Sequence, residues 1–549
     1  MKTELAPCPD LLHPTPCLRI DLDKTRLDLN LAFAGGVAGG LFEEALAKAE
    51  LAPSSWDAAA FEGDLFLRRF VAGAFKIRVG KVEGPIAGEH LVRLLAHPPS
   101  DRGTLEHRRA ILAELATTPE LRKRLEELYW ALARVRGLFE NTSGARNWDP
   151  ARRQLDLLLA VKEVFDLLAV GFASSRTGLA ALSVWGGQIL TSEPYRSLSD
   201  LLRYDERLAT LSLKVGVGAD GRIRGFEVVS IAEDGENPFV NPPWRRWLAK
   251  AELFLRGYRF SDGEVMTRLV DAVFMGFESE LVALVQLLGD LEFYLGALAF
   301  RDQARAAGLE VCLPELVSPD APRALEGLFN PLLLLAGIQP VPCDLKSERL
   351  AATILVTGPN SGGKTRLLQS LGLAQLLGQA GAFIPARAGS LAPTSSLVMS
   401  LIQETRADQA EGRLGTELVR IRSLFERLPP GAMVLLDELC SGTNPSEGEE
   451  IFELVIEMLS KLSPQSFITT HFLTFAGRLA RERRFTELEF LQVELGPERR
   501  ATYQFVPGVA TTSLAGHTAE RLGVTGDQLL ALIENNLRRF AGSRGEASG

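Results

Sequence analysis

The chain has 549 residues, of which 60 are basic and 69 acidic, so its formal net charge is −9 at pH 7. This length predicts several domains rather than one core, and the acidic excess excludes a wholly basic nucleic-acid coat while leaving room for a local basic patch. Five scattered cysteines without a CxxC pair argue against a disulfide framework and indicate a reducing, cytoplasmic compartment. The longest apolar stretches are short or interrupted by acidic residues, so we expect no membrane partner.

Helical periodicity dominates the first half of the chain. Apolar residues recur at spacings of three and four between about residues 61 and 207, which predicts a mainly helical region. Residues 211–231 alternate in character around an Asp-Gly pair, and this pattern predicts a β-hairpin. A second helical block is expected over about 244–307, followed by a proline-spaced loop over 314–342.

A phosphate-binding motif opens the second half. From residue 351 on, short apolar strands alternate with helical segments, which predicts a parallel α/β sheet. The strand over 353–357 runs directly into a sequence that fits GxxxxGK[ST]. Glycines let backbone N–H groups wrap the phosphates, Lys364 reaches the outer phosphates, and the Thr365 hydroxyl ligates Mg²⁺. The predicted nucleotide-binding residues are Gly358, Pro359, Asn360, Ser361, Gly362, Gly363, Lys364 and Thr365.

Two later strand ends supply candidate catalytic groups. A buried-type strand over 432–436 ends at Asp437 and Glu438; we expect Asp437 to hold Mg²⁺ through water and Glu438 to polarise the attacking water. The alternative interpretation of this acidic pair is a helix cap. A strand over 465–470 ends at His471, which is placed to sense a γ-phosphate, although a lone histidine is more often structural.

Several segments together resemble the MutS family of DNA mismatch-repair proteins. The likeness to the family's ATPase domain lies in residues 357–365, 436–448 and 469–472, with further likeness to its C-terminal segment at 503–524 and to its helical core at 94–115. The resemblance extends over roughly residues 61–540. It implies ATP and Mg²⁺ as cofactors and DNA as a partner.

The resemblance implies a multidomain fold, with a mainly α-helical core and lever region, an α/β P-loop ATPase domain of the ABC type and a small C-terminal helical segment. The expected divisions are an N-terminal segment at 1–60, the helical core at 61–320 with its hairpin at 211–231, a linker at 321–345, the ATPase domain at 346–510 and a dimerisation segment with tail at 511–549. The implied function is that of a homodimeric clamp that couples ATP binding and hydrolysis to recognition of mismatched or branched DNA in repair or recombination.

Two features depart from the family pattern. Only the residues before 61 precede the core, so we expect the mismatch-recognition domains to be absent. Phe42 and Glu44 fit the family's Phe-x-Glu wedge, but an amphipathic helix is the favoured interpretation. The family's Ser-Thr-aromatic loop has no counterpart in residues 408–418, where Thr416 is only a weak substitute. The sequence therefore leaves open whether this loop supports hydrolysis across two subunits.

Candidate DNA contacts follow the hairpin. Arg245, Arg246, Lys250 and Arg256 are interleaved with aromatic residues, a mixture that suits a nucleic-acid backbone and stacked bases. The alternative is a lever helix with solvated cations, and the mildly basic stretch at 102–124 is expected to be ordinary surface charge. A competing hypothesis for the whole chain is a nucleotide-switched interaction scaffold that does not bind DNA, which the net acidity favours.

Overall fold

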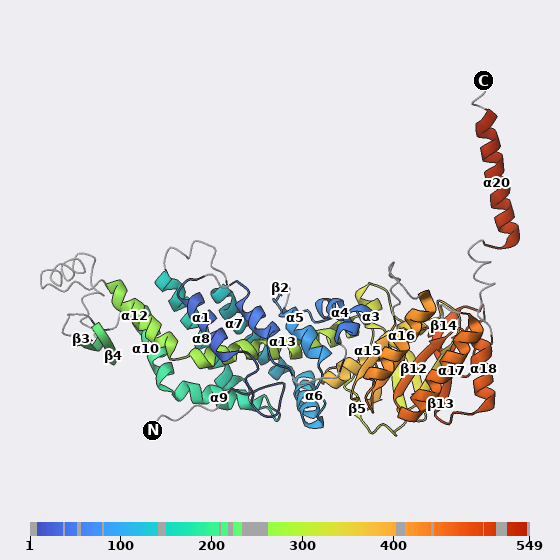
Figure 1. The fold of residues 1–549 in the computed structure, drawn as a ribbon. Coiled ribbons are helices and arrows are strands. Elements are labelled where there is room, and N and C mark those ends of the chain that lie inside the picture. Colours follow the sequence, from blue (N-terminus) through green and yellow to red (C-terminus); the bar gives the residue numbers. More distant parts are fainter. Residues whose placement is uncertain are drawn as a thin grey trace. The chain divides into compact units, whose positions relative to one another are not determined.

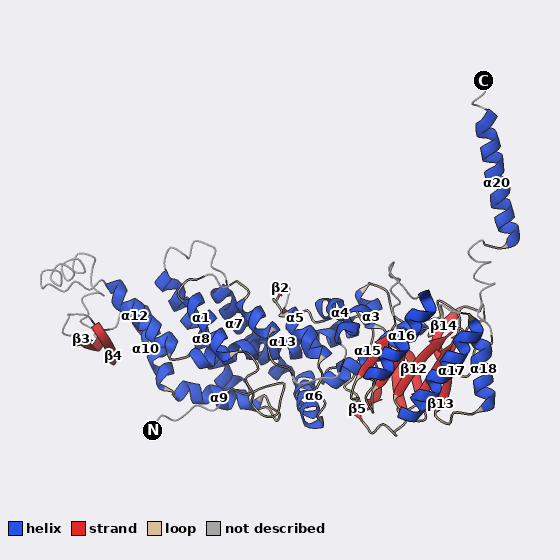
Figure 2. Cartoon of the chain, viewed as in Figure 1, coloured by secondary structure: helices blue, strands red, loops and turns tan. Residues whose placement is uncertain are grey.

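The computed structural model divides the chain into two compact units. Unit 1 contains Met1–Pro53, Arg68–Gln303 and Ala380–Ala382, and unit 2 contains Ser54–Leu67, Ala304–Gln379 and Phe383–Gly549. The residues that the structure describes are 8–36, 39–51, 56, 58–79, 82–140, 150–207, 210–217, 223–232, 262–401, 412–440, 444–497, 499–511 and 524–545. Unit 1 is mainly helical, and unit 2 combines helices with mixed sheets (Figures 1 and 2).

The helices of unit 1 follow the apolar periodicity of the sequence. The predicted core positions Leu121, Leu125, Leu128, Leu132 and Val135 are all buried on one helix, which confirms the helical interpretation of this region. The helices are α1 (Leu22–Phe33), α2 (Leu41–Ala47), α4 (Leu67–Ala74), α5 (Gly88–Ala96), α6 (Arg102–Thr117), α7 (Pro119–Glu140), α8 (Pro150–Gly171), α9 (Ala180–Thr191), α10 (Glu193–Arg207), α12 (Asp262–Met275) and α13 (Glu278–Ala306).

Short strands interrupt these helices. Strands β1 (Arg78–Val79) and β2 (Val82–Glu83) form a small antiparallel ribbon. Strands β3 (Thr210–Val217) and β4 (Ile223–Ala232) pair antiparallel, which confirms the predicted hairpin. The part of the second helical block that precedes α12, residues 233–261, lies outside the described residues.

Helix α13 is the central helix of the unit 1 core. Its length and composition would allow it to cross a membrane, yet its most apolar window is entirely buried inside the protein. Asp290 and Glu292 lie on this helix and are also buried. Burial of a long apolar helix that carries acidic groups is typical of a core helix rather than a lipid-facing one.

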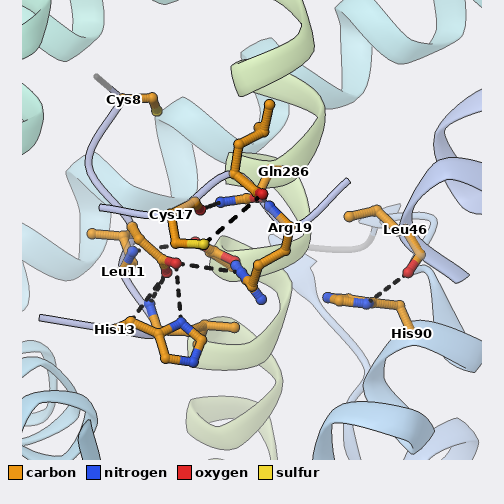
Figure 3. Close-up of polar contacts among 12 residues, drawn as sticks. Cys8, Leu11, His13, Cys17, Arg19, Leu46, His90 and Gln286 are labelled. Carbon is orange, nitrogen blue, oxygen red and sulfur yellow. Dashed lines mark hydrogen bonds and ion pairs between the residues drawn. The ribbon is translucent and has the colours of Figure 1, made fainter. Parts of the chain in front are cut away.

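The irregular N-terminal segment is held against α13 by buried polar side chains (Figure 3). Arg19 forms ion pairs with Asp10 and Asp290, and these three residues are called the N-terminal anchor below. Gln286 accepts from the Arg19 N–H at 2.6 Å and donates to the Cys17 carbonyl at 2.8 Å. Side chains thus supply the hydrogen bonds that a buried segment outside regular structure needs.

Two sequence interpretations are settled by burial in unit 1. Phe42 lies on α2 and is 1% exposed, so the helix interpretation of the Phe-x-Glu pair is confirmed and its ring is unavailable as a surface wedge. The interpretation of Arg108 as surface charge is wrong, because Arg108 is 2% exposed and donates to the carbonyl of Leu12 at 2.8 Å. Burial lowers the pKa of Arg108 to about 10.

Unit 2 is built on a six-stranded sheet of order β10-β11-β12-β8-β13-β14. All neighbouring pairs are parallel except β13 and β14, which are antiparallel, so the predicted parallel sheet is confirmed apart from its last strand. The strands are β8 (Thr353–Thr357), β10 (Leu397–Ser400), β11 (Met433–Leu436), β12 (Gln465–Thr470), β13 (Leu488–Leu495) and β14 (Ala501–Pro507).

Helices flank this sheet (Figure 2), and a buried hydrophobic cluster packs against it. Phe452 on α17 and Phe475 on α18 stack at a centroid distance of 5.4 Å inside a buried cluster with Leu436 and Ile468. The helices of unit 2 are α3 (Ala58–Asp64), α14 (Pro331–Leu335), α15 (Lys364–Ala380), α16 (Gly412–Arg427), α17 (Pro445–Leu462), α18 (Leu473–Glu482) and α20 (Gly526–Gly545).

A second sheet takes two of its four strands from the segment 314–342, which was predicted to be loop. Its order is β5-β9-β6-β7, with strands β5 (Glu315–Leu316), β6 (Arg323–Leu328), β7 (Cys343–Ser347) and β9 (Ala388–Leu391). The loop prediction over 314–342 is therefore wrong, and the predicted linker 321–345 contains β6, α14 and the start of β7. The prolines misled the interpretation because Pro331 begins a helix after the cap Asn330, a position that proline favours.

Candidate nucleotide site

The loop between β8 and α15 forms the centre of the candidate site. Strand β8 is buried along its whole length, and α15 begins at Lys364, directly after the glycines of the motif. Gly358 has a φ of 143°, and a Cβ there would lie 2.6 Å from Cγ2 of Val493. The loop therefore requires glycine at this position both for backbone conformation and for space. Its sequence places the N-terminus of a helix, with its free N–H groups, beside the pocket.

Lys364 is buried in this loop and donates to neutral backbone carbonyls. It is 5% exposed, and its Nζ donates to the carbonyls of Gly358 and Pro359 at 3.1 and 3.2 Å. Burial lowers the pKa of Lys364, while the nearby charges of Glu438 and Asp437 act in the opposite direction. A desolvated ammonium group held by neutral carbonyls is suited to a phosphate ligand.

The two acids at the end of β11 are organised by two threonines. The Thr365 hydroxyl donates to Oδ2 of Asp437 at 2.5 Å, and the Thr469 hydroxyl donates to Oδ1 of the same carboxylate at 2.5 Å. The backbone N–H of Glu438 in turn donates to Oγ1 of Thr469 at 2.9 Å. Glu438 has a φ of 46°, a strained backbone that such fixed contacts hold in place.

These groups line one side of a cavity of about 840 Å³. Tyr503 also lines it and lies close to the P-loop, because a Cβ on Gly363 would be 3.2 Å from the Tyr503 ring. The remaining wall mixes apolar and polar side chains from three parts of unit 2. The lining residues outside the P-loop include Phe66, Asn330, Ile338, Val341, Gln369 and Phe505.

The residues present fit Mg²⁺ with a nucleoside triphosphate. Mg²⁺ is commonly held in proteins by one or two carboxylates together with substrate phosphates. Asp437 and the Thr365 hydroxyl supply such a partial ligand set, and the described part of the chain has no group of three or more His, Cys, Asp or Glu side chains that could hold a metal without phosphate. The P-loop and Lys364 would hold the phosphates, while the apolar wall and Tyr503 would accept the base.

The structure does not place every predicted site residue in the cavity. Asn360 to Thr365, Asp437 and Glu438 line it, and Gly358 and Pro359 contribute carbonyls to Lys364. His471 follows β12 as predicted, but it is exposed, its ring lies 4.3 Å from that of Phe472, and it is not among the lining residues.

Other predicted positions lie outside the described residues. These are Arg245, Arg246, Lys250 and Arg256, and residues 408–411 of the altered loop. Thr416 falls within α16. The proposed DNA contacts thus remain sequence predictions.

Sequence reasoning assigned no role to Thr469, Asn330, Phe66 or Tyr503. Thr469 carried the clearest signal, since it is the second-last residue of the strand that neighbours β11 and lies two residues before the predicted His471. Asn330 caps α14 and donates to the carbonyl of Arg366 on α15 at 3.1 Å. Its Asn-Pro pair marked a helix start but gave no hint of this long-range contact.

Comparison with known proteins agrees with this geometry. Residues 354–538 match the family model for MutS domain V. The C-terminal part of the chain therefore carries a MutS-type domain. The matched residues contain the P-loop, both strand-end acids and the C-terminal part of unit 2, so the MutS P-loop ATPase-type domain coincides with the candidate site.

Relatives named endonuclease MutS2 cover more of the chain. The protein from Streptococcus agalactiae is 33% identical over 242 residues, which are 43% of this chain and 29% of the relative. That from Thermomicrobium roseum is 30% identical over 344 residues, 59% of this chain and 40% of the relative. That from Streptococcus mutans is 32% identical over 253 residues, 45% of this chain and 30% of the relative. The chain thus matches less than half the length of each of these MutS relatives.

Proposed function

We propose that this chain is an ATP-dependent DNA-binding protein that binds Mg²⁺-ATP in the P-loop cavity and hydrolyses it. The observation that carries the proposal is the Thr365–Asp437–Thr469–Glu438 chain of hydrogen bonds beside Lys364. It joins a metal-binding hydroxyl and carboxylate to a second acid within one rigid network. The match to MutS domain V supports the same chemistry.

Each side chain has a distinct task in the proposed hydrolysis. Lys364 and the N–H groups of the P-loop bind the outer phosphates and stabilise the charge that develops on them. Thr365 and Asp437 would hold Mg²⁺, which supplies charge neutralisation to the phosphates. Glu438 orients the attacking water, and Thr469 keeps both acids in register with the cavity.

DNA is the partner that we propose for the nucleotide-driven change. The match to MutS domain V and the name MutS2 of the relatives support a role in DNA repair or recombination. We propose mismatched or branched DNA as the substrate class. The endonuclease activity in that name is not proposed here, because the matched part covers 29% to 40% of the relatives. The five cysteines are scattered along the sequence without a CxxC pair, which supports action in a reducing cytoplasm.

A homodimer is proposed on the basis of the C-terminal helix. Helix α20 exposes an apolar set, Leu529, Leu530, Leu532, Ile533 and Leu537, each between 42% and 65% exposed. Such a set on one helix is typical of a surface that pairs with a partner. Light scattering of the full chain and of an Ile533→Glu, Leu537→Glu variant tests this: a dimer that becomes monomeric supports the proposal, and a monomeric wild type refutes it.

Steady-state hydrolysis tests the catalytic assignment. The wild type is compared with Glu438→Gln, which keeps the size of the side chain but removes its basicity. We expect turnover to fall by roughly 10²- to 10⁴-fold, the usual contribution of such a group, while Mg²⁺-ATP still binds. Equal turnover in the two proteins would remove Glu438 from its proposed role.

DNA binding is tested on matched, mismatched and four-way substrates at low salt, with and without ATP. We expect a nucleotide-dependent shift that weakens, with a smaller salt slope, when Arg245, Arg246 and Arg256 are changed to Glu. Nucleotide binding without any DNA shift would favour the interaction scaffold instead.

A further inference from the structure

The turn between α3 and α4 places an unusual backbone at the nucleotide cavity. Phe66 has a φ of 50°, the left-handed region in which a bulky side chain is an outlier and glycine is the common choice. Phe66 nevertheless lines the same cavity as Lys364 and Thr365. The turn therefore keeps an aromatic ring at the cavity wall although glycine would form it with less strain.

Asp64, two residues earlier, joins this turn to two elements of the ATPase half. Its backbone carbonyl accepts from Nε2 of Gln369 on α15 at 3.0 Å. Its carboxylate Oδ2 accepts from the N–H of Leu401, the residue after β10, at 3.0 Å. Asp64 is 8% exposed, so both bonds are made in a largely desolvated position, where a displaced partner is costly.

Leu65 fixes the same turn by packing. A Cβ on Gly372 of α15 would lie 3.0 Å from Leu65 Cδ2, 3.0 Å from Met399 Cε and 3.3 Å from Leu435 Cδ1. The absence of a side chain at Gly372 thus allows Leu65, β10 and β11 to meet against α15. Close packing of this kind transmits small displacements, because it leaves no space to absorb them.

We propose that Asp64–Phe66 is a nucleotide-sensing turn, in which Phe66 contacts the nucleotide and Asp64 relays occupancy of the cavity to Leu401. The inference rests on the proposed nucleotide site and adds a contact from outside the matched residues 354–538. The chain passes from unit 2 into unit 1 between Leu67 and Arg68. Phe66 directly precedes Leu67, the first residue of α4.

Hydrogen–deuterium exchange of the full chain tests the relay. Exchange is followed in the free protein and with Mg²⁺ and a non-hydrolysable ATP analogue at saturation. We expect peptides over 358–365, over 61–70 and at Leu401 to become protected together. The peptides over 358–365 report binding itself, whereas the other two report the sensing turn.

Two substitutions at residue 66 distinguish the effect of the aromatic ring from that of the unfavourable backbone conformation. Phe66→Gly removes both, while Phe66→Ala removes the ring and keeps the unfavourable backbone. We expect each to weaken binding of the analogue by roughly two- to tenfold, the range for a lost aromatic contact, and to abolish protection at Leu401. Phe61→Leu is the control, since Phe61 is buried on α3 against Trp56 but does not line the cavity, and it should leave affinity unchanged.

The outcomes distinguish this inference from the proposed function. If 358–365 becomes protected while 61–70 and Leu401 do not, the nucleotide site stands and the sensing turn is refuted. Wild-type affinity in a folded Phe66→Gly protein refutes the Phe66 contact. If 358–365 shows no protection at any concentration of analogue, the nucleotide site itself fails and the sensing turn fails with it.

Discussion

The N-terminal anchor of unit 1 and the P-loop cavity of unit 2 both bury charged side chains, but they neutralise them differently. In the anchor, one guanidinium, that of Arg19, lies between the carboxylates of Asp10 and Asp290. In the cavity, Lys364 donates to two backbone carbonyls, and the acids Asp437 and Glu438 are held by threonines. The anchor is complete in itself, whereas the cavity presents its charges to a space that a ligand can fill.

The two sites also differ in how burial shifts the pKa of their charged side chains. Burial raises the pKa of Asp290 to about 6, against the opposing influence of Arg19, and burial lowers the pKa of Lys364. When a charge is matched inside the fold, removal of its partner leaves an uncompensated buried charge and destabilises the fold. A cationic side chain that is left with neutral partners is instead available to stabilise a bound anion. We therefore expect mutation of the anchor to lower folding stability and mutation of the cavity to lower ligand affinity.

Arg19→Met should have the largest effect on stability. The substitution keeps much of the side-chain volume but leaves Asp10 and Asp290 buried without their cation, a change that typically costs about 3–5 kcal/mol. Chemical denaturation of the full chain measures this loss, and nucleotide affinity of the folded protein should stay unchanged. Arg102→Met is the control, because the Arg102–Glu106 pair is exposed and should contribute less than about 1 kcal/mol. Equal losses in the two variants would contradict the comparison.

Lys364→Met should show the reverse pattern. Removing the ammonium group takes away a charged hydrogen bond to phosphate, so we expect Mg²⁺-ATP affinity to fall by roughly ten- to a hundredfold. The unfolding free energy without nucleotide should stay within about 1 kcal/mol of wild type, because the lost bonds to two carbonyls are offset by the removed desolvation of the charge. Isothermal titration and denaturation measure the two quantities, and a large stability loss would show that Lys364 is structural.

The two sites also differ in how far the sequence predicts them. The P-loop is continuous, so residues 358–365 and the strand before them were identified from local pattern alone, and β8, β12 and most of β11 match their predicted ranges. The anchor joins residues 271 positions apart. No local periodicity contains such a pairing, and Arg108, which donates to Leu12, was accordingly misassigned to the surface.

The same limit applies within the cavity. Asp437 and Glu438 were predictable because acids at the end of an apolar strand form a visible pattern, whereas Phe66 and Asn330 reach the cavity through folding of distant segments. The short strands β6 and β7 were missed because their neighbours in the sheet, not their own composition, stabilise them.

The buried carboxyl group of Glu292 in unit 1 should make the stability of the fold depend on pH. It is fully buried, Oε2 accepts from the Ala87 N–H at 2.8 Å, and burial raises its pKa to about 8. The folded state therefore binds this proton more tightly than the unfolded state, whose value is near 4.5. The resulting stability is fully present below pH 4.5 and is lost as pH rises towards 8.

Glu292→Gln should flatten this dependence, because the amide keeps an acceptor for Ala87 and cannot ionise. At pH 8 to 9 we expect the unfolding free energy of the variant to exceed that of wild type by roughly 4 kcal/mol, with little difference at pH 5. Denaturation midpoints across this range are the measurement. Glu106→Gln, at an exposed site, should leave the slope unchanged, and an unaltered slope in Glu292→Gln would show that Glu292 does not set it.

Thr469→Val makes the finest distinction, because it tests whether the acids of the cavity depend on their threonine support. Valine matches the shape of threonine but neither donates to Asp437 nor accepts from Glu438. We expect hydrolysis to fall by about tenfold, the equivalent of one net hydrogen bond, with little change in KM.

Thr470→Val is a matched control on the same strand, since the Thr470 hydroxyl accepts from Phe472 instead. If both variants hydrolyse ATP equally well, the acids are held by the strand end alone. A loss specific to Thr469 would show that the cavity, unlike the anchor, keeps its charges in place with neutral groups so that they remain free to act on a ligand.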